Sequence, residues 1–240
     1  MPKLIIDKLV KSYNGKKVVD AVDLEVEDGK VVGLLGPNGA GKTTTFYMAV
    51  GLIKPEKGNI ILNSKNITDD PMYLRARKGI GYLPQESSIF RKLTVKENIL
   101  VILEALPMPA PDRKKKAEKL LEELGIQHLE NRKAYVLSGG ERRRLEISRV
   151  LATDPDFVLL DEPFAGIDPL AVTDIQDIIG HLKKKGIGIL ISDHNVRETL
   201  GVCDNAYIMN EGKVIESGHP EKITESKIAR QFYLGDEFRL

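Results

Sequence analysis

Apolar residues occur in short runs along the 240-residue chain, and the character of these runs changes with position. Near the N-terminus the runs are rich in β-branched residues and lie beside glycine-containing turn dipeptides, which predicts strands over residues 4–9, 17–26 and 59–62. Three other runs are almost wholly apolar and strand-sized, which predicts buried strands over residues 31–35, 157–161 and 188–192.

The middle of the chain has helical spacing instead. Thr94 and Glu97 are spaced as a capping box for a helix over residues 95–105. After Asp112, a charged stretch places its apolar residues on one face and then reaches Gly125, which is typical of a helix and its C-terminal stop. The apolar residues of that face are Ala117, Leu120, Leu121 and Leu124.

A further amphipathic helix is predicted between the last two buried strands, with Asp168 as its N-cap and Pro169 as its first residue. Its apolar stripe consists of Val172, Ile175, Ile179 and Leu182. A hairpin around residues 210–212 and a short amphipathic tail follow the last of these strands.

Because strand and helix signals alternate without a repeat or a low-complexity linker, the pattern predicts an α/β fold. The β-rich N-terminal part and the later strands are expected to form one core from residues 1–85 and 154–240. The helical stretch, residues 86–153, is expected to form a lobe inserted into that core.

Composition and charge exclude several classes of protein. With 42% apolar and 30% charged residues, the chain is neither disordered nor fibrous. A net charge of +1 excludes a whole-chain attraction to nucleic acid or to an anionic membrane. The single cysteine, Cys203, excludes a disulfide within the chain, fits a reducing compartment, and is expected to pack as a small apolar side chain.

Residues 1–10 lack the basic leader and the long apolar run of a secretion signal, so export is not expected. No apolar stretch approaches the roughly 18 residues that cross a bilayer. We therefore expect a cytoplasmic protein. If it serves a membrane, another chain spans the bilayer.

The first chemical motif is a glycine-rich loop between a predicted strand and a predicted helix: Gly36-Pro37-Asn38-Gly39-Ala40-Gly41-Lys42-Thr43. This is the spacing of a P-loop, in which backbone N–H groups converge on phosphate at a helix N-terminus. Lys42 is expected to neutralise the β- and γ-phosphates of ATP, Thr43 to bind Mg²⁺, and Thr44 to lie beside it in the nucleotide site. A plain glycine-rich turn is the simpler alternative, but it does not explain the strand before the loop and the helix after it.

The second motif is a pair of carboxylates, Asp161 and Glu162, at the end of an apolar strand, where α/β sheets bind ligands. Asp161 suits the coordination of a metal ion, and Glu162 suits the orientation or deprotonation of the attacking water. Taken alone, such a pair is usually a helix cap or a solvated loop. Downstream of a P-loop, the chemical role is favoured.

The third motif, Leu137-Ser138-Gly139-Gly140-Glu141, lies between the other two and opens a helix, with Ser138 and Glu141 spaced as a capping box. A well-capped helix is the simpler interpretation. It does not explain two glycines, which destabilise a helix unless bare backbone must approach another group closely. Gly139 and Gly140 therefore indicate a second helix end that binds phosphate.

Together these motifs resemble those of the ATP-binding-cassette (ABC) family, whose signature is LSGGE, and the resemblance covers essentially the whole chain. The resemblance implies the cassette fold, in which a P-loop NTPase core carries a β-rich N-terminal subdomain and an inserted helical subdomain. It also implies an ATPase that forms a homodimer and works on permease subunits carried on other chains. The expected location is the cytoplasmic face of the inner membrane.

The same resemblance assigns roles to four further residues. Tyr13 lies where the family stacks an aromatic residue on adenine, although a lone Tyr commonly only packs. Gln85 matches the glutamine that touches Mg²⁺ and links the core to the helical lobe. His194 matches the histidine that contacts the γ-phosphate, and Asp168 matches a loop that crosses the dimer interface, although its capping role alone could explain it.

Several longer stretches resemble the ATPase subunits of lipopolysaccharide exporters within the family: residues 43–48, 81–94, 140–144, 164–169, 193–199 and 233–240. The ATPases of branched-chain amino-acid importers share the middle stretches but not the final eight residues, and they are the nearest alternative. A small-molecule kinase would have no use for residues 137–141. A non-transport cassette ATPase acting on ribosomes or DNA usually carries two cassettes or a long coiled coil.

Phe90 and Arg91 follow the Gln85 loop and are expected to line a groove that receives a short helix of the membrane partner. Packing of Phe90 in the core is an equally good interpretation, because aromatic residues are common both in cores and in interfaces.

Overall fold

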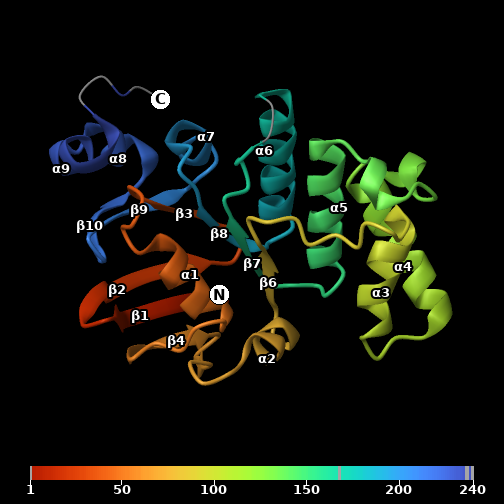
Figure 1. The fold of residues 1–240 in the computed structure, drawn as a ribbon, viewed down its shortest axis with the longest axis horizontal. Helices are drawn as coiled ribbons and strands as arrows, with labels where there is room; N and C mark the ends of the chain where they lie inside the picture. The colour runs from red at the N-terminus through yellow and green to blue at the C-terminus, as the bar shows by residue number, and fades with distance from the viewer. Residues whose placement is uncertain (1, 167–168, 236–237, 239–240) are drawn as a thin grey trace.

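The computed structural model describes residues 2–166, 169–235 and 238, and its strands form two sheets (Figure 1). The smaller sheet is antiparallel, with the strand order β2-β1-β4-β5. Its strands are β1 (Lys3–Tyr13), β2 (Lys16–Glu27), β4 (Lys57–Leu62) and β5 (Lys65–Asn66).

The larger sheet has the order β10-β9-β3-β8-β7-β6 and is parallel except at its edge, where β10 pairs antiparallel with β9. Its strands are β3 (Val31–Leu35), β6 (Ile80–Leu83), β7 (Phe157–Asp161), β8 (Gly188–Ser192), β9 (Asn205–Asn210) and β10 (Lys213–Gly218). β3, β7 and β8 are buried along their whole length, as expected for inner parallel strands.

Helix α1 (Lys42–Val50) lies between the two sheets, where Phe46 and Met48 are fully buried in one apolar cluster with residues of both. The other helices are α2 (Met72–Arg77), α3 (Val95–Glu104), α4 (Ala110–Glu123), α5 (Gly139–Leu151), α6 (Pro169–Lys184), α7 (Val196–Leu200), α8 (Pro220–Glu225) and α9 (Lys227–Ala229), with single helical turns η1 (Gln127–Leu129), η2 (Ala134–Val136) and η3 (Arg230–Leu234).

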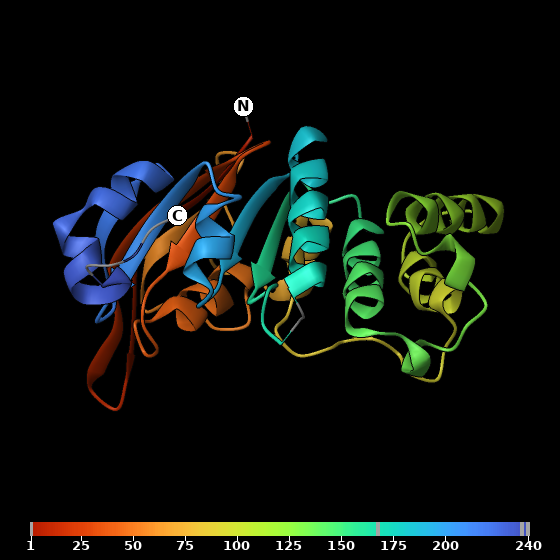
Figure 2. The ribbon, with the colours of Figure 1, turned by 90° about the horizontal axis from the view of Figure 1, so that it is seen from above.

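Helices α3 and α4 form one end of the molecule, α5 stands beside them, and α6 covers the large sheet next to α5 (Figure 2). Apolar residues of these four helices share one cluster with the sheet. The C-terminal helices α8 and α9 lie at the opposite end (Figure 1).

These elements confirm the predicted α/β fold, since all six predicted strands form. Both predicted capping boxes are present: Thr94 caps α3 and Ser138 caps α5. Pro169 opens α6 as expected, whereas Asp168 lies outside the described residues. Cys203 packs against the apolar cluster of the helices, and burial raises the pKa of its thiol. Across the described ranges, no helix has the length and apolar character that a bilayer crossing requires.

Candidate functional site

The loop between β3 and α1 adopts backbone conformations that require glycine at two positions. Gly36 has a φ of 150°, and a Cβ there would lie 2.2 Å from the carbonyl oxygen of Met209. Gly41 has a φ of 102°, and its Cβ would lie 2.3 Å from the carbonyl oxygen of Val18. The loop therefore curls tightly at the start of α1, where the first helical N–H groups have no partner within the helix and can bind an anion.

Lys42 lies inside this loop, only 7% exposed, and its Nζ donates hydrogen bonds to the carbonyl oxygens of Gly36 (2.7 Å) and Pro37 (3.1 Å). Burial lowers the pKa of Lys42, while the carboxylates of Glu162, Asp193 and Asp161 act in the opposite direction. Thr43 follows it and is exposed, and Thr44 is half-buried. The loop thus encloses a cation that faces nearby carboxylates.

A cavity of about 580 Å³ adjoins the outer side of the loop. It is lined by Lys16, Lys17, Val18, Pro37, Asn38, Gly39, Ala40, Asn210, Glu211 and Gly212. Tyr13 is the last residue of β1, just before the turn into β2, whose first residues line this cavity. Its surface is 44% exposed, and the Nζ of Lys11 lies 5.6 Å from its ring centroid. An exposed ring at this position is free to stack on a flat ligand.

The two predicted carboxylates follow one another at the end of β7. Asp161 is 3% exposed and accepts a long hydrogen bond, 3.4 Å, from the Tyr82 hydroxyl. Burial, and next the charge of Glu162, raise the pKa of Asp161 to about 6. Glu162 has a left-handed backbone, with a φ of 46°, and its N–H donates to the carbonyl oxygen of Ser192 at 2.6 Å. Strained backbone of this kind is common at functional sites.

Two other predicted residues converge on Glu162. The Gln85 Nε2 donates to the Glu162 Oε2 at 2.7 Å, and the His194 Nδ1 lies 3.3 Å from the same oxygen. The structure therefore brings together side chains from three loops, which follow β6, β7 and β8 at one edge of the large sheet. The Gln85 amide faces Glu162, so its contact with a metal stays a prediction.

The signature residues lie elsewhere. Ser138 and Gly139 are exposed at the start of α5, and the Ser138 Oγ accepts from the Glu141 N–H at 3.3 Å while the Glu141 carboxylate accepts from the Ser138 N–H at 2.8 Å. A Cβ on Gly139 would meet no atom within 4 Å. In Figures 1 and 2, α5 stands apart from α1, on the side of α3 and α4. Ser138 and Gly139 are therefore exposed on a turn that stands apart from the P-loop of their own chain.

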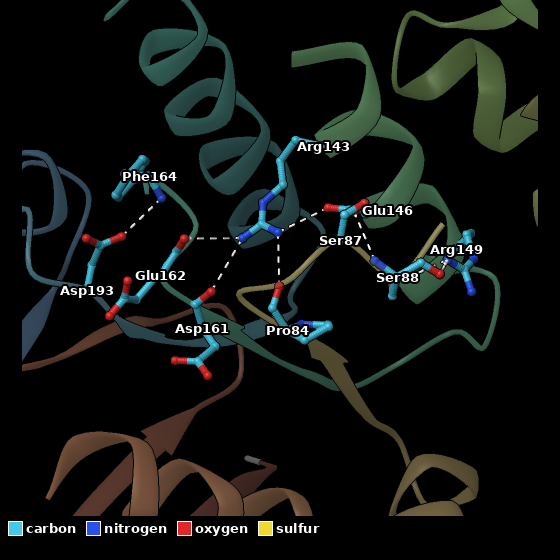
Figure 3. A network of polar contacts seen from close by, with 10 residues as sticks. All are labelled: Pro84, Ser87, Ser88, Arg143, Glu146, Arg149, Asp161, Glu162, Phe164 and Asp193. Atoms are coloured by element: carbon cyan, nitrogen blue, oxygen red, sulfur yellow. Dashed lines mark hydrogen bonds and ion pairs between the residues drawn. The ribbon is translucent and has the colours of Figure 1, made fainter. Parts of the chain in front are cut away.

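A buried polar network joins α5 to the end of β7 and to the loop that carries Gln85 (Figure 3). Arg143, 6% exposed, lies 3.1 Å from the Glu146 carboxylate and donates to the carbonyl oxygen of Pro84 at 3.2 Å. Glu146 in turn accepts from the Ser87 hydroxyl at 2.6 Å. This network fixes the loop that carries Gln85 to the signature helix. The contacts to Pro84 and Ser87 each join residues 59 positions apart in sequence, so no local pattern reveals them.

Phe90 is 44% exposed, so it is not a core residue. Its ring lies under the Arg149 guanidinium, 4.7 Å from the centroid, and the buried Asn98 side chain bonds both its N–H and its carbonyl oxygen. Beside it, between α2, β6 and α5, is a groove of about 240 Å³. Phe90 and the exposed Arg91 are not among the residues that line this groove. Arg149 lines the groove and also contacts the Phe90 ring.

Comparisons with known proteins point to one family. The profile of the family described as ABC transporter matches residues 19–165. A lipopolysaccharide export system ATP-binding protein of Acidithiobacillus ferridurans is 55% identical over 97% of this chain and 96% of its own length. One of Haemophilus influenzae is 52% identical over the full length of both. A crystal structure of an ATP-binding cassette in its ADP conformation is 31% identical and covers 98% of this chain and all of its own, with a TM-score of 0.88.

Proposed function

The chain belongs to the ABC transporter family of ATPases, and we propose that it powers a lipopolysaccharide exporter. Identity of 52–55% to lipopolysaccharide export ATP-binding proteins, along nearly the whole length of both chains, is the observation that carries this proposal. The sequence resemblance to the cassette fold and to this transport group agrees with these relatives.

In the proposed site, ATP lies with its phosphates on residues 36–43 and its adenine near Tyr13. Lys42 neutralises phosphate charge, and Glu162 orients and deprotonates the attacking water. The Gln85 amide and the His194 imidazole both contact the Oε2 of Glu162 and hold its carboxylate in place. His194 is half-exposed, and its proposed second role is to contact the γ-phosphate.

We assign Mg²⁺ to Thr43, Gln85 and Asp161, because hydroxyl, amide and carboxylate oxygens are its preferred ligands. The described part of the chain holds no cluster of three His, Cys, Asp or Glu side chains suited to a metal. This suits Mg²⁺, which commonly uses one or two carboxylates together with substrate phosphates. When bound, the ion neutralises charge that develops on the phosphates.

Two chains are proposed to close each site. The P-loop and the signature turn stand apart in one chain, and the exposed glycine backbone of α5 is an unused anion-binding end. A two-fold axis would place the signature turn of each chain on the ATP of the other and make both sites equivalent.

Purification of the chain from its native membrane tests the cargo directly. Mass spectrometry of the co-purifying subunits should identify the permeases of a lipopolysaccharide exporter. Recovery of branched-chain amino-acid permeases in stoichiometric amounts would replace the proposed cargo while leaving the ATPase assignment intact.

Phe90→Ala is expected to abolish assembly with the membrane partner while leaving the isolated ATPase folded and active, because the ring is 44% exposed and lies under the Arg149 guanidinium at the surface. Co-purification, ATPase turnover and the melting temperature should be measured together. Phe232→Ala is the matched control, since Phe232 is 49% exposed and lies at the C-terminal end. Retained assembly in Phe90→Ala, or a melting temperature lowered by more than about 5 °C, would contradict the interface role.

A further inference from the structure

Asp193, which lies between β8 and His194, is a buried carboxylate that the mechanism above does not use. Its side chain is 0% exposed. Its Oδ2 accepts from the Phe164 N–H at 3.0 Å, and its Oδ1 accepts from the Asn195 N–H at 2.8 Å. One carboxylate thus bonds the backbone of two different loops (Figure 3 shows the bond to Phe164).

Each of these loops carries one of the residues that meet at the site. Phe164 is two residues after Glu162, and Asn195 directly follows His194. The Glu162 N–H also bonds the carbonyl oxygen of Ser192, the residue before Asp193. Hydrogen bonds therefore join the two loops on both sides of Glu162. On the Phe164 side, Asp193 accepts from the Phe164 N–H, and the Asn195 amide adds a longer bond, 3.4 Å, to the Phe164 carbonyl oxygen.

We propose that Asp193 is a positioning residue that fixes Glu162 and His194 relative to each other by holding the backbone of both loops. This proposal rests on the proposed role of Glu162 in hydrolysis. A carboxylate suits the task because it is acceptor-only and can receive two N–H groups at once, and bonds to a charged acceptor are about twice as strong as neutral ones.

The surroundings keep this carboxylate away from solvent. Burial raises the pKa of Asp193, and the N–H groups of Asn195 and Phe164 oppose that change. The C-terminal segment contributes Tyr233, whose buried hydroxyl has its pKa raised to about 12 by burial and, to a smaller extent, by the charge of Asp193. Protein groups, with little water, thus surround the two hydrogen bonds, which strengthens them.

Asp193→Asn keeps the size of the side chain but presents an amide NH₂ to one of the two N–H donors, so one of the two hydrogen bonds is lost. We expect the turnover at saturating ATP to fall about 10²-fold, as small displacements of catalytic groups commonly do, with the affinity for ATP little changed. Asp204→Asn is the matched control: Asp204 accepts from the Val31 N–H at 2.9 Å at the opposite end of β3. It should leave turnover within about twofold of wild type, because that change lies far from the chemistry.

If Asp193 acts by positioning Glu162, its effect on turnover should depend on the presence of the Glu162 carboxylate. In a Glu162→Gln background, Asp193→Asn should lower the residual turnover by less than about threefold, because residues that act as a unit are not additive. A full 10²-fold further loss in that background would overturn the proposal, since it would assign Asp193 a separate role.

A second pair of variants serves if Asp193→Asn does not fold. Asn195 has a φ of −79°, which proline tolerates, so Asn195→Pro deletes the N–H that Asp193 accepts while keeping the carboxylate. Asn195→Ala keeps that N–H and should retain at least about tenfold more turnover than Asn195→Pro. Equal turnover of the two variants, or normal turnover in Asp193→Asn beside an inactive Glu162→Gln, would overturn the positioning role. Normal turnover of Glu162→Gln would instead overturn the proposed function.

Discussion

Replacing Glu162 by Gln is expected to lower ATP turnover by about 10²–10⁴-fold while ATP binding stays near that of the wild type. The reason is chemical: the amide cannot accept the proton of the attacking water. The structure predicts little disturbance around it, because a glutamine of the same shape can still accept the Gln85 Nε2 hydrogen bond of 2.7 Å. Phosphate release and the dissociation constant of a fluorescent ATP analogue should be measured on the same preparation.

Glu198→Gln is the control for this experiment. Glu198 lies on α7, four residues after His194, and the substitution removes the same charge near the site. Its turnover should match that of the wild type. Turnover of Glu162→Gln within about threefold of the control would remove Glu162 from the role of general base.

Mixing Lys42→Ala chains with Gly139→Asp chains is expected to restore ATPase activity that neither variant has alone. Lys42→Ala removes the buried cation of the P-loop. Gly139→Asp places a negative charge at the start of α5, where an added Cβ meets nothing within 4 Å, so the fold should survive. If sites are shared, a mixed dimer collects both defects in one site and leaves the other intact. Roughly a quarter of wild-type activity should return, because half of randomly paired dimers are mixed.

A second mixture gives the experiment an outcome that does not depend on restored activity. Wild-type chains are combined with chains that carry both Lys42→Ala and Gly139→Asp. In a shared-site dimer, the double mutant damages both sites of a mixed pair, so it should inhibit the wild-type chains. An inactive first mixture, together with a second mixture that keeps the full activity of its wild-type chains, would mean that each chain completes its own site.

The elements that could be predicted from sequence were those specified by neighbouring residues. Capping boxes depend on residues three positions apart, and both form as predicted. The tight turn of the P-loop requires glycine at positions 36 and 41, because a Cβ there would clash with backbone that is distant in sequence. The spacing of these glycines nevertheless makes the turn recognisable from sequence. Strand β6 was not predicted: it is a four-residue edge strand defined mainly by its pairing with β7, which lies about 75 residues later.

In the candidate site, too, some features follow from local motifs and others depend on contacts between distant residues. The positions of Lys42, Asp161, Glu162, Gln85 and His194 follow from motifs, and the structure brings these residues together. The roles of Arg143 and Asp193 depend on hydrogen bonds between residues far apart in sequence, which no spacing indicates. Sequence alone also could not decide whether Phe90 is a core residue, because the same aromatic side chain suits either place, and only its 44% exposure excludes the core.

Light scattering of Glu162→Gln protein shows whether two chains close on ATP. This variant should bind ATP without consuming it, so the closed pair should accumulate. We predict the mass of two chains with saturating ATP and the mass of one chain without nucleotide, and Lys42→Ala introduced into the same protein should prevent the change. A protein that binds ATP yet keeps the mass of one chain at high concentration would rule out sites shared between two chains.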